Sequence, residues 1–286
     1  MIAIFRQPRA DIDVKLERIY FRPGENVEAA VTILPSESFT LRHCSVDLVC
    51  VETYYMNHSE GSPSEHKRDL ERITEPLLAN VEVLKGESIG GVVQFEVPRD
   101  AVQSIFGEAT RIVWEVQVLV DVSRGRDLHR IKGMIVSGQP PVGSSLGRQE
   151  SESKHGILTL SCPEIMISAG GQVEGRLELQ TYREFSVKDI RVQLERTEWA
   201  MDKKLIKTVA EGVLHGPDRL APNQLLQWPF SFNMPNGALP SVKIGYSGVI
   251  WKVKAIAACG LFSDLVVEQE IRVFAGYSTA DKLRAQ

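Results

Sequence analysis

The sequence has no hydrophobic run of membrane-spanning length. A helix that crosses a bilayer needs about 18 apolar residues, whereas the best candidate, residues 248–262, is interrupted by Lys252 and Lys254. The first residues show no basic region ahead of an apolar segment, so they do not resemble a secretory signal. These two absences predict a cytoplasmic protein without a transmembrane segment.

Cysteine is also scarce, with four residues spread over the chain: Cys44, Cys50, Cys162 and Cys259. Cys44 and Cys50 would lie on one face of a single strand, too far apart for a disulfide. The set fits neither a disulfide framework nor a zinc site. We expect buried free thiols, as in a reducing cytoplasm.

An excess of basic charge is missing, because 33 Lys and Arg face 37 Asp and Glu, a net charge of −4. A surface that binds nucleic acid phosphates is therefore not expected.

Catalytic and metal-binding patterns are missing too. Residues 245–248 precede a strand rather than the helix that a nucleophile elbow needs, and the six histidines lack metal-ligand spacing. We expect no enzymatic activity, no cofactor and no metal.

Helical periodicity is nearly absent, while short runs of alternating apolar and polar residues recur along the chain. Such runs occupy residues 12–17, 27–33 and 44–50, with turn signals such as Pro23-Gly24 between them. This pattern predicts antiparallel β-sandwiches of about seven strands, each sheet with one buried and one exposed face.

The sequence does contain a duplication. Four residues recur 137 positions later (251 − 114 = 137): Phe95, Pro98, Ser104 and Trp114 are matched by Phe232, Pro235, Ser241 and Trp251. Earlier in the chain, residues 45–52 match residues 191–198 at an offset of 146 (192 − 46 = 146). The second copy therefore lacks 146 − 137 = 9 residues that the first copy has.

The nine extra residues fall in the polar, charged stretch around residues 57–69. We expect an exposed loop over residues 56–76, ending in a strand near residues 70–73. Loops that accept insertions lie on the surface and often carry function. The candidate protein-binding residues are His58, Glu65, His66, Lys67 and Arg68, although a solvated face without function explains the same residues.

Other duplicated residues point to structural roles. Trp114 and Trp251 lie on the apolar faces of long strands, which predicts core packing rather than ligand binding. Asp127 and Asp264, also 137 apart (264 − 127 = 137), precede a closing strand, where a turn role is expected.

A stretch rich in Gly, Pro and Ser divides the chain. We expect an N-terminal β-sandwich over residues 1–138, a linker over residues 139–154, a C-terminal β-sandwich over residues 155–275 and a short tail over residues 276–286.

Three phrases carry a resemblance to a known family: residues 16–28, residues 230–241 with their Phe-x-Phe-x-x-Pro and Pro-Ser pairs, and residues 251–254. In order and spacing they resemble the arrestin-like superfamily, which includes arrestins, arrestin-domain proteins, the arrestin-fold subunit of retromer and bacterial sporulation-control proteins. The resemblance covers residues 11–275. It implies two tandem Ig-like (arrestin-type) antiparallel β-sandwich domains and a non-catalytic adaptor or scaffold that binds other proteins, among them membrane-associated cargo or receptors.

The sequence departs from animal arrestins, since it has no long tail after Phe274 and no Pro-Pro-x-Tyr motif. An adaptor would engage partners through the charged loop, the loop at residues 101–109 or a sheet edge. Two alternatives stay open: an assembly protein whose sandwiches pair at their edges, and a sandwich that binds a small ligand or carbohydrate. The identity of the partner and the oligomeric state are left open as well.

Overall fold

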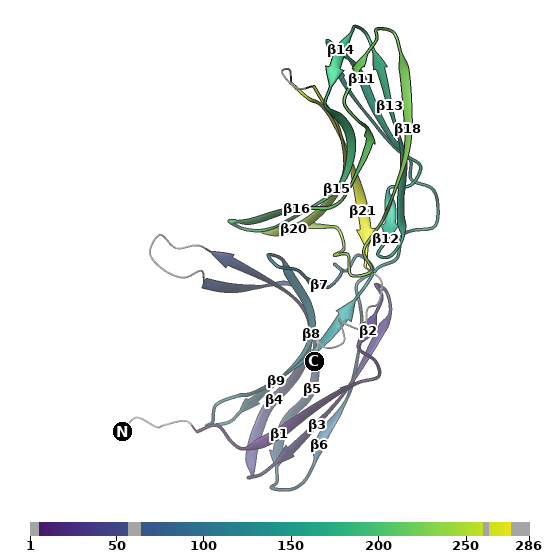
Figure 1. Ribbon diagram of the computed structural model, residues 1–286. Coiled ribbons are helices and arrows are strands. Elements are labelled where there is room, and N and C mark those ends of the chain that lie inside the picture. The colour runs from purple at the N-terminus through teal and green to yellow at the C-terminus, as the bar shows by residue number, and fades with distance from the viewer. Residues whose placement is uncertain (1–5, 57–63, 260–262, 276–286) are drawn as a thin grey trace.

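Figure 1 shows the computed structural model of the chain, which describes residues 6–56, 64–259 and 263–275. Every helix or strand in these residues is a β-strand, so the all-β prediction is confirmed. Within the same residues there is no helix that could cross a lipid bilayer.

Nine strands precede residue 137, and we call this part the first half. They are β1 (Ala10–Leu16), β2 (Tyr20–Phe21), β3 (Asn26–Pro35), β4 (Phe39–Met56), β5 (Ser64–Val83), β6 (Ile89–Glu96), β7 (Ile105–Phe106), β8 (Arg111–Val122) and β9 (Leu128–Val136).

Twelve strands follow residue 146, and we call this part the second half. They are β10 (Gly147–Ser153), β11 (Gly156–Cys162), β12 (Met166–Ser168), β13 (Gln172–Thr181), β14 (Phe185–Val187), β15 (Asp189–Ala200), β16 (Lys203–His215), β17 (Asp218–Leu220), β18 (Leu225–Asn233), β19 (Val242–Ile244), β20 (Ser247–Ala258) and β21 (Leu265–Phe274).

The two halves share one strand order. The first half has a sheet β1-β3-β6 and a larger sheet β2-β9-β8-β4-β5, with β7 paired to β8. The second half has a sheet β10-β11-β13-β18 and a larger sheet β12-β21-β20-β15-β16, with β19 paired to β20, plus the pair β14-β17. Every sheet in the described residues is built from one half only.

The molecule is a crescent in Figure 1, and the larger sheet of each half faces its concave side. The β4–β5 hairpin projects from the middle of that side, next to the end of the second half that carries β16 and β20. The junction of the two halves and the hairpin beside it therefore occupy the centre of the crescent.

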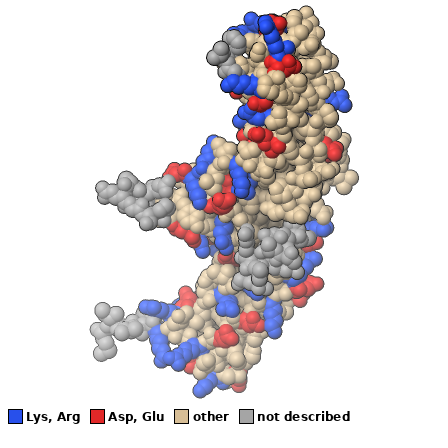
Figure 2. All heavy atoms as spheres, in the orientation of Figure 1, with Lys and Arg blue, Asp and Glu red and all other residues tan. Residues whose placement is uncertain are grey.

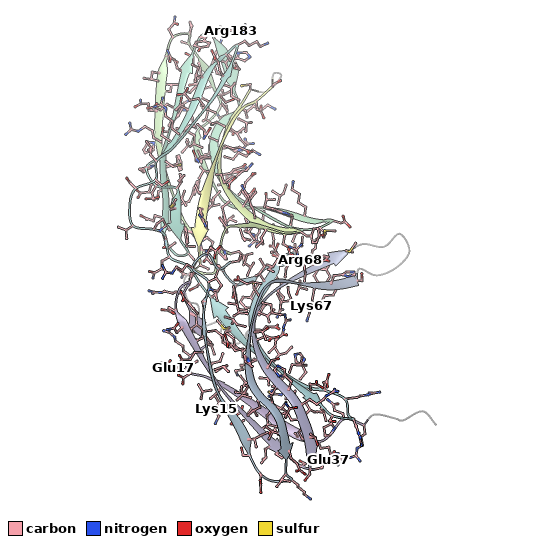
Figure 3. All side chains as sticks on the ribbon, turned by 180° about the vertical axis from the view of Figure 1, so that it is seen from behind. Lys15, Glu17, Glu37, Lys67, Arg68 and Arg183 are labelled. Carbon is pink, nitrogen blue, oxygen red and sulfur yellow. The ribbon has the colours of Figure 1, made fainter. Side chains whose placement is uncertain are left out.

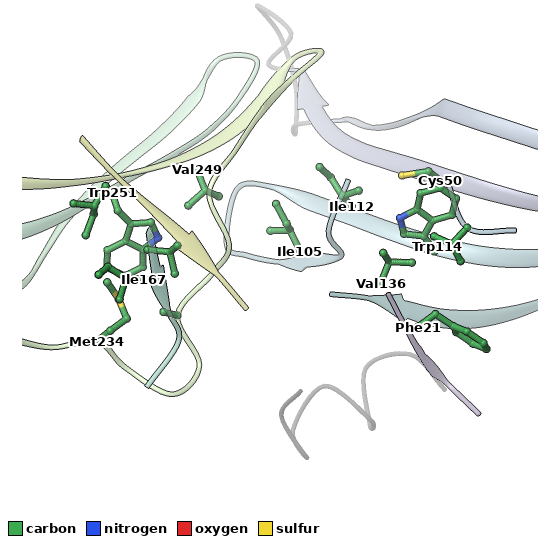
Figure 4. Packing of buried hydrophobic residues seen from close by; sticks show 14 of the residues in the cluster. Phe21, Cys50, Ile105, Ile112, Trp114, Val136, Ile167, Met234, Val249 and Trp251 are labelled. Carbon is green, nitrogen blue, oxygen red and sulfur yellow. The ribbon is translucent and has the colours of Figure 1, made fainter. Parts of the chain in front are cut away.

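The predicted core residues are buried at equivalent points of the two halves. Trp114 and Trp251 are 0% and 1% exposed, and Figure 4 shows each indole packed among apolar side chains of its own half. The Trp114 indole N–H donates to the carbonyl of Val102, and that of Trp251 to Leu239, both at 2.8 Å. The acceptors are again 137 apart (239 − 102 = 137), so the duplication extends to hydrogen bonds, and the prediction of core packing is confirmed.

The predicted turn role of the paired aspartates is also confirmed. The Asp127 carboxylate accepts the backbone N–H of Val122 at 3.2 Å, and Asp264 accepts that of Cys259 at 2.9 Å. Each side chain thereby closes the connection that leads into the last strand of its half.

The expected loop over residues 56–76 is wrong for most of its length, because β5 begins at Ser64 and pairs with β4 up to Met56. Polar residues occupy this strand because it lies at a sheet edge and extends beyond the sandwich core. Backbone hydrogen bonds hold it, so no apolar alternation is required.

The nine extra residues do lie in this hairpin. Glu52 pairs with Arg68, 68 − 52 = 16 positions away, whereas its equivalent Glu198 pairs with Leu205, 205 − 198 = 7 positions away. The difference, 16 − 7 = 9, is the predicted insertion.

The expected linker is shorter than residues 139–154, because β10 occupies residues 147–153 and pairs along its length with β11. Most residues of β10 are exposed, so its sequence lacks the apolar alternation that would predict a strand. The four cysteines are free and buried, as expected.

Candidate functional site at the junction of the two halves

Two fully buried carboxylates lie where the halves meet. Glu52 on β4 and Glu198 on β15 are both 0% exposed, and they occupy the same position of each copy (198 − 52 = 146). A buried carboxylate is strongly unfavourable unless hydrogen bonds and opposite charge compensate for the lost water. The partners of both side chains therefore define this site.

Glu198 binds a turn of the first half. One of its oxygens, Oε1, accepts the backbone N–H groups of Ala109 and of Thr110, the latter at 2.7 Å. The second oxygen lies 3.4 Å from the guanidinium of Arg196. The Thr110 hydroxyl donates back to the carbonyl of Trp199 at 2.7 Å. The turn between β7 and β8 is thus fastened to β15.

Glu52 makes the reciprocal contact. Its Oε1 accepts the backbone N–H of Tyr246 at 3.1 Å, in the turn between β19 and β20, and its Oε2 lies 3.4 Å from Nε of Arg68. Tyr246 is the equivalent of Ala109 (246 − 109 = 137). Each half therefore inserts the same glutamate into the same turn of the other half, as the two subunits of a symmetric dimer do. We call these two contacts the carboxylate latch.

Glycine makes room for each carboxylate. A Cβ added to Gly107 would lie 2.2 Å from Oε1 of Glu198, and one added to Gly245 would lie 2.7 Å from Oε2 of Glu52. Gly245 also has a positive φ of 49°. Only a residue without a side chain lets the backbone approach the buried carboxylates this closely.

Gln103 lies close to the local symmetry axis between the halves. Its side-chain oxygen accepts the backbone N–H of Gly138 at 3.0 Å and that of Ala275 at 3.2 Å. These two donors are equivalent positions of the two copies (275 − 138 = 137). One amide thus joins the ends of β9 and β21.

The predicted residues lie on a strand rather than a loop. Glu65, His66, Lys67 and Arg68 belong to β5, while His58 lies outside the described residues. Figure 3 shows Arg68 on the side of the hairpin that faces the second half and Lys67 on the opposite side. The alternation of the strand therefore divides the predicted group in two.

His66 and Arg68 reach the junction. The Arg68 guanidinium lies 4.9 Å from the centre of the Tyr246 ring, and the Tyr54 ring lies between His66 at 5.6 Å and Tyr246 at 5.1 Å. These ring and guanidinium contacts lie beside Glu52, which is fully buried.

Glu65 and Lys67 instead border a hollow of about 260 Å³ on the concave side. We call it the Val51 hollow. It is lined by Val51, Thr53, Tyr55, Glu65, Lys67, Arg111, Val113 and Glu115. Basic and acidic side chains are interspersed around the middle of the concave side in Figure 2, so this region does not carry charge of a single sign.

The loop at residues 101–109 is not a free surface. Ile105 and Ala109 are 0% and 2% exposed, and Ala109 donates to Glu198 of the second half. The expectation that this loop engages partners is therefore wrong for its buried C-terminal part. Gly107 and Ala109 of this loop instead lie against Glu198 in the contact between the halves.

The contacts of this site hold the two halves against each other. The carboxylates of the latch accept main-chain hydrogen bonds and face guanidinium groups, which fixes their charge in place. No cluster of three or more His, Cys, Asp and Glu suited to a metal ion occurs in residues 6–56, 64–259 and 263–275.

Sequence reasoning missed Glu52 and Glu198 as site residues, although a signal was present. Glu52 has the same strand parity as Cys44 and Cys50, whose face was predicted to be buried. A carboxylate on an apolar face, repeated at the duplication offset, indicates a buried charge with a dedicated partner.

The chain was also compared with known proteins. No protein-family model matches it, and a search of curated proteins finds no match.

Proposed function

We propose that this protein is a non-catalytic adaptor or scaffold of the arrestin-like type, which binds partner proteins, among them membrane-associated cargo or receptors. The carboxylate latch carries the proposal. It holds two similarly built halves in one orientation, so that the concave faces and the β4–β5 hairpin form one continuous surface. Such a preorganised surface binds a partner at a lower ordering cost than two independently oriented halves would.

The edge of the first half suits protein recognition. β5 is 20 residues long and has a strand neighbour, β4, on only one side in its sheet. Its free backbone groups can pair with an extended segment of a partner. The four buried free thiols support a location in a reducing compartment such as the cytoplasm.

Photo-crosslinking in the source cell tests the proposal. A benzoylphenylalanine in place of Thr74, an exposed residue of β5, should give discrete crosslinked proteins. The same group in place of Glu28, an exposed residue of β3, serves as the matched control. If neither Thr74 nor other β5 positions crosslink beyond the Glu28 background, the protein is not an adaptor that uses this surface.

A second candidate function is assembly through paired edges. The 13-residue strand β16 lies at the edge of its sheet, equivalent to β5 in the first half. Pairing of two such edges would build oligomers. Light scattering distinguishes the two candidates, because assembly requires a molecular mass that rises with protein concentration and an adaptor of this kind does not.

A further inference from the structure

The Val51 hollow has an apolar floor and a charged rim. Val51 and Val113 are only 6% and 7% exposed, yet they lie on the face of the sheet opposite to the sandwich core. Lys67 is paired with Glu65 at 4.0 Å. Arg111 contacts the Phe106 ring at 5.8 Å and has no carboxylate partner among the described residues.

The second half shows how the same place is filled. In the first half Thr53 pairs across the strands with Arg111, and in the second half Trp199 pairs with Gly248. These are equivalent positions (199 − 53 = 146 and 248 − 111 = 137). The Trp199 ring lies directly over Gly248, where an added Cβ would be 2.0 Å from the ring. The second half thus covers this position with its own indole, and the first half leaves it open.

The size of the hollow selects its occupant. Its volume of about 260 Å³ is several times the roughly 30 Å³ of a water molecule. It is below the range of about 300–1,000 Å³ that is typical of sites for whole small molecules. A single large side chain fits this space, as the indole of Trp199 covers the equivalent place in the second half.

The charged residues around the hollow determine which residues can flank the bound side chain in the partner. Lys67 and Arg111 line the hollow. A third cation, Lys203 of the second half, lies beside it, with its ammonium 5.9 Å from the centre of the Tyr55 ring. The lining itself holds two cations and two carboxylates, Glu65 and Glu115, and Lys203, which also donates to the Glu108 carbonyl at 2.6 Å, adds a third cation at the border. Glu65 is paired with Lys67. The Arg111 guanidinium contacts the Phe106 ring and no carboxylate of the described residues, so it is available to an external carboxylate.

We propose that the Val51 hollow binds an aromatic side chain of a partner protein, in a segment whose neighbouring residues are acidic. The proposal rests on the adaptor function and names the chemistry of the partner. An aromatic side chain seated on an apolar floor inside a charged rim has the composition of an interface hot spot.

Methyl NMR of the full chain tests this inference with three eight-residue peptides. The first carries one tryptophan followed by two glutamates, the second replaces the tryptophan by alanine, and the third replaces the glutamates by lysines. Saturable shifts of the Val51 and Val113 methyl signals are expected with the first peptide, at an affinity at least about tenfold above the other two. No shift, or equal shifts with all three, would overturn the proposal.

A variant that fills the hollow with the residues of the second half provides the decisive test, and we call it the plugged variant. Thr53→Trp combined with Arg111→Gly copies the second half into the first and should reduce binding of the first peptide at least about tenfold. Arg111→Glu alone should have a similar effect, and it keeps the test valid if the double variant does not fold. Arg130→Gly removes an exposed cation elsewhere in the first half and should leave binding unchanged. Peptide binding that survives in both the plugged variant and Arg111→Glu would overturn the inference.

The two proposals fail in different ways. Crosslinks from β5 that persist in the plugged variant, together with no peptide binding, would refute the hollow and leave the adaptor intact. Peptide binding at Val51 without any crosslinked protein in cells would refute the adaptor and leave the hollow as a binding site.

Discussion

At the scale of single residues, the most consequential pair is Glu52 and Glu198. Neither side chain contacts water, and each satisfies main-chain donors of the opposite half. Their contribution to stability is best measured by removing them, because the loss of either carboxylate leaves buried backbone N–H groups without an acceptor. Removing one partner of a buried polar contact leaves the other unsatisfied, which costs about 1–3 kcal/mol.

We therefore expect Glu198→Ala to lower the melting temperature more than Glu52→Ala, because Glu198 accepts two N–H groups and Glu52 accepts one. A loss of about 1–3 kcal/mol corresponds to roughly 2–12 °C at about 2–4 °C per kcal/mol. Calorimetry measures the shift. The control is Glu96→Ala, which removes an exposed ion pair with Arg99 and should change stability by less than about 0.5 kcal/mol. An equal shift in the control would refute the role of the latch.

The buried thiols make stability depend on alkaline pH. Burial raises the pKa of Cys44 and Cys162 from 9.0 to about 11 and that of Cys50 to about 12. Because these pKa values are raised in the folded state, the stabilising contribution is complete below pH 9.0. It is lost as the pH rises from about 9 to about 12, by at most about 1.4 kcal/mol per pH unit for each thiol.

Melting curves at pH 8, 9.5 and 10.5 measure this loss. The triple variant Cys44→Ala, Cys50→Ala, Cys162→Ala should lose less stability over this range than the unmodified chain, since lysine and tyrosine titrate equally in both. Parallel pH profiles would show that the thiols do not contribute.

At the scale of secondary-structure elements, β5 is the strand that departs most from a sandwich pattern. It is long, charged and unpaired on one side in its sheet. Edge strands of this kind can pair with other chains, and charged residues together with proline restrict the pairing of two copies of the same edge. Pro76 lies within β5 and provides no N–H for an incoming strand.

We expect the double variant Glu75→Val, Pro76→Val to self-associate, since it restores a donor and removes a charge at the edge. Static light scattering should show an apparent mass that rises with concentration. Thr32→Val, an exposed change in the inner strand β3, is the control and should stay unchanged. A variant as dispersed as the control would mean that other residues protect this edge.

At the scale of the whole molecule, the halves are arranged like the subunits of a symmetric dimer joined in one chain. The reciprocal contacts of Glu52 and Glu198 with equivalent turns, and the amide of Gln103 between equivalent backbone donors, follow a local two-fold relation. Such an interface couples the stabilities of the parts that it joins.

This coupling predicts a single cooperative unfolding transition for the intact chain. In the variant Glu52→Ala, Glu198→Ala both latch contacts are lost, and calorimetry should resolve two transitions, one for each half. A double variant that still unfolds in one transition, with equal calorimetric and van't Hoff enthalpies, would show that apolar contacts alone couple the halves.

The sequence by itself determined the local and repetitive features. Alternation identified the buried strands, the offsets of 137 and 146 identified the duplication, and Asp127 and Asp264 were placed at turns because the residues involved are close in the sequence. Polar edge strands escaped the same reasoning, because β5 and β10 are held by backbone pairing and bury little apolar surface. Only the tertiary structure decided which glutamate meets which turn and why Trp199 covers a place that Thr53 leaves open. The glutamate contacts join residues about 90 to 190 positions apart, and no local pattern encodes the geometry that brings them together.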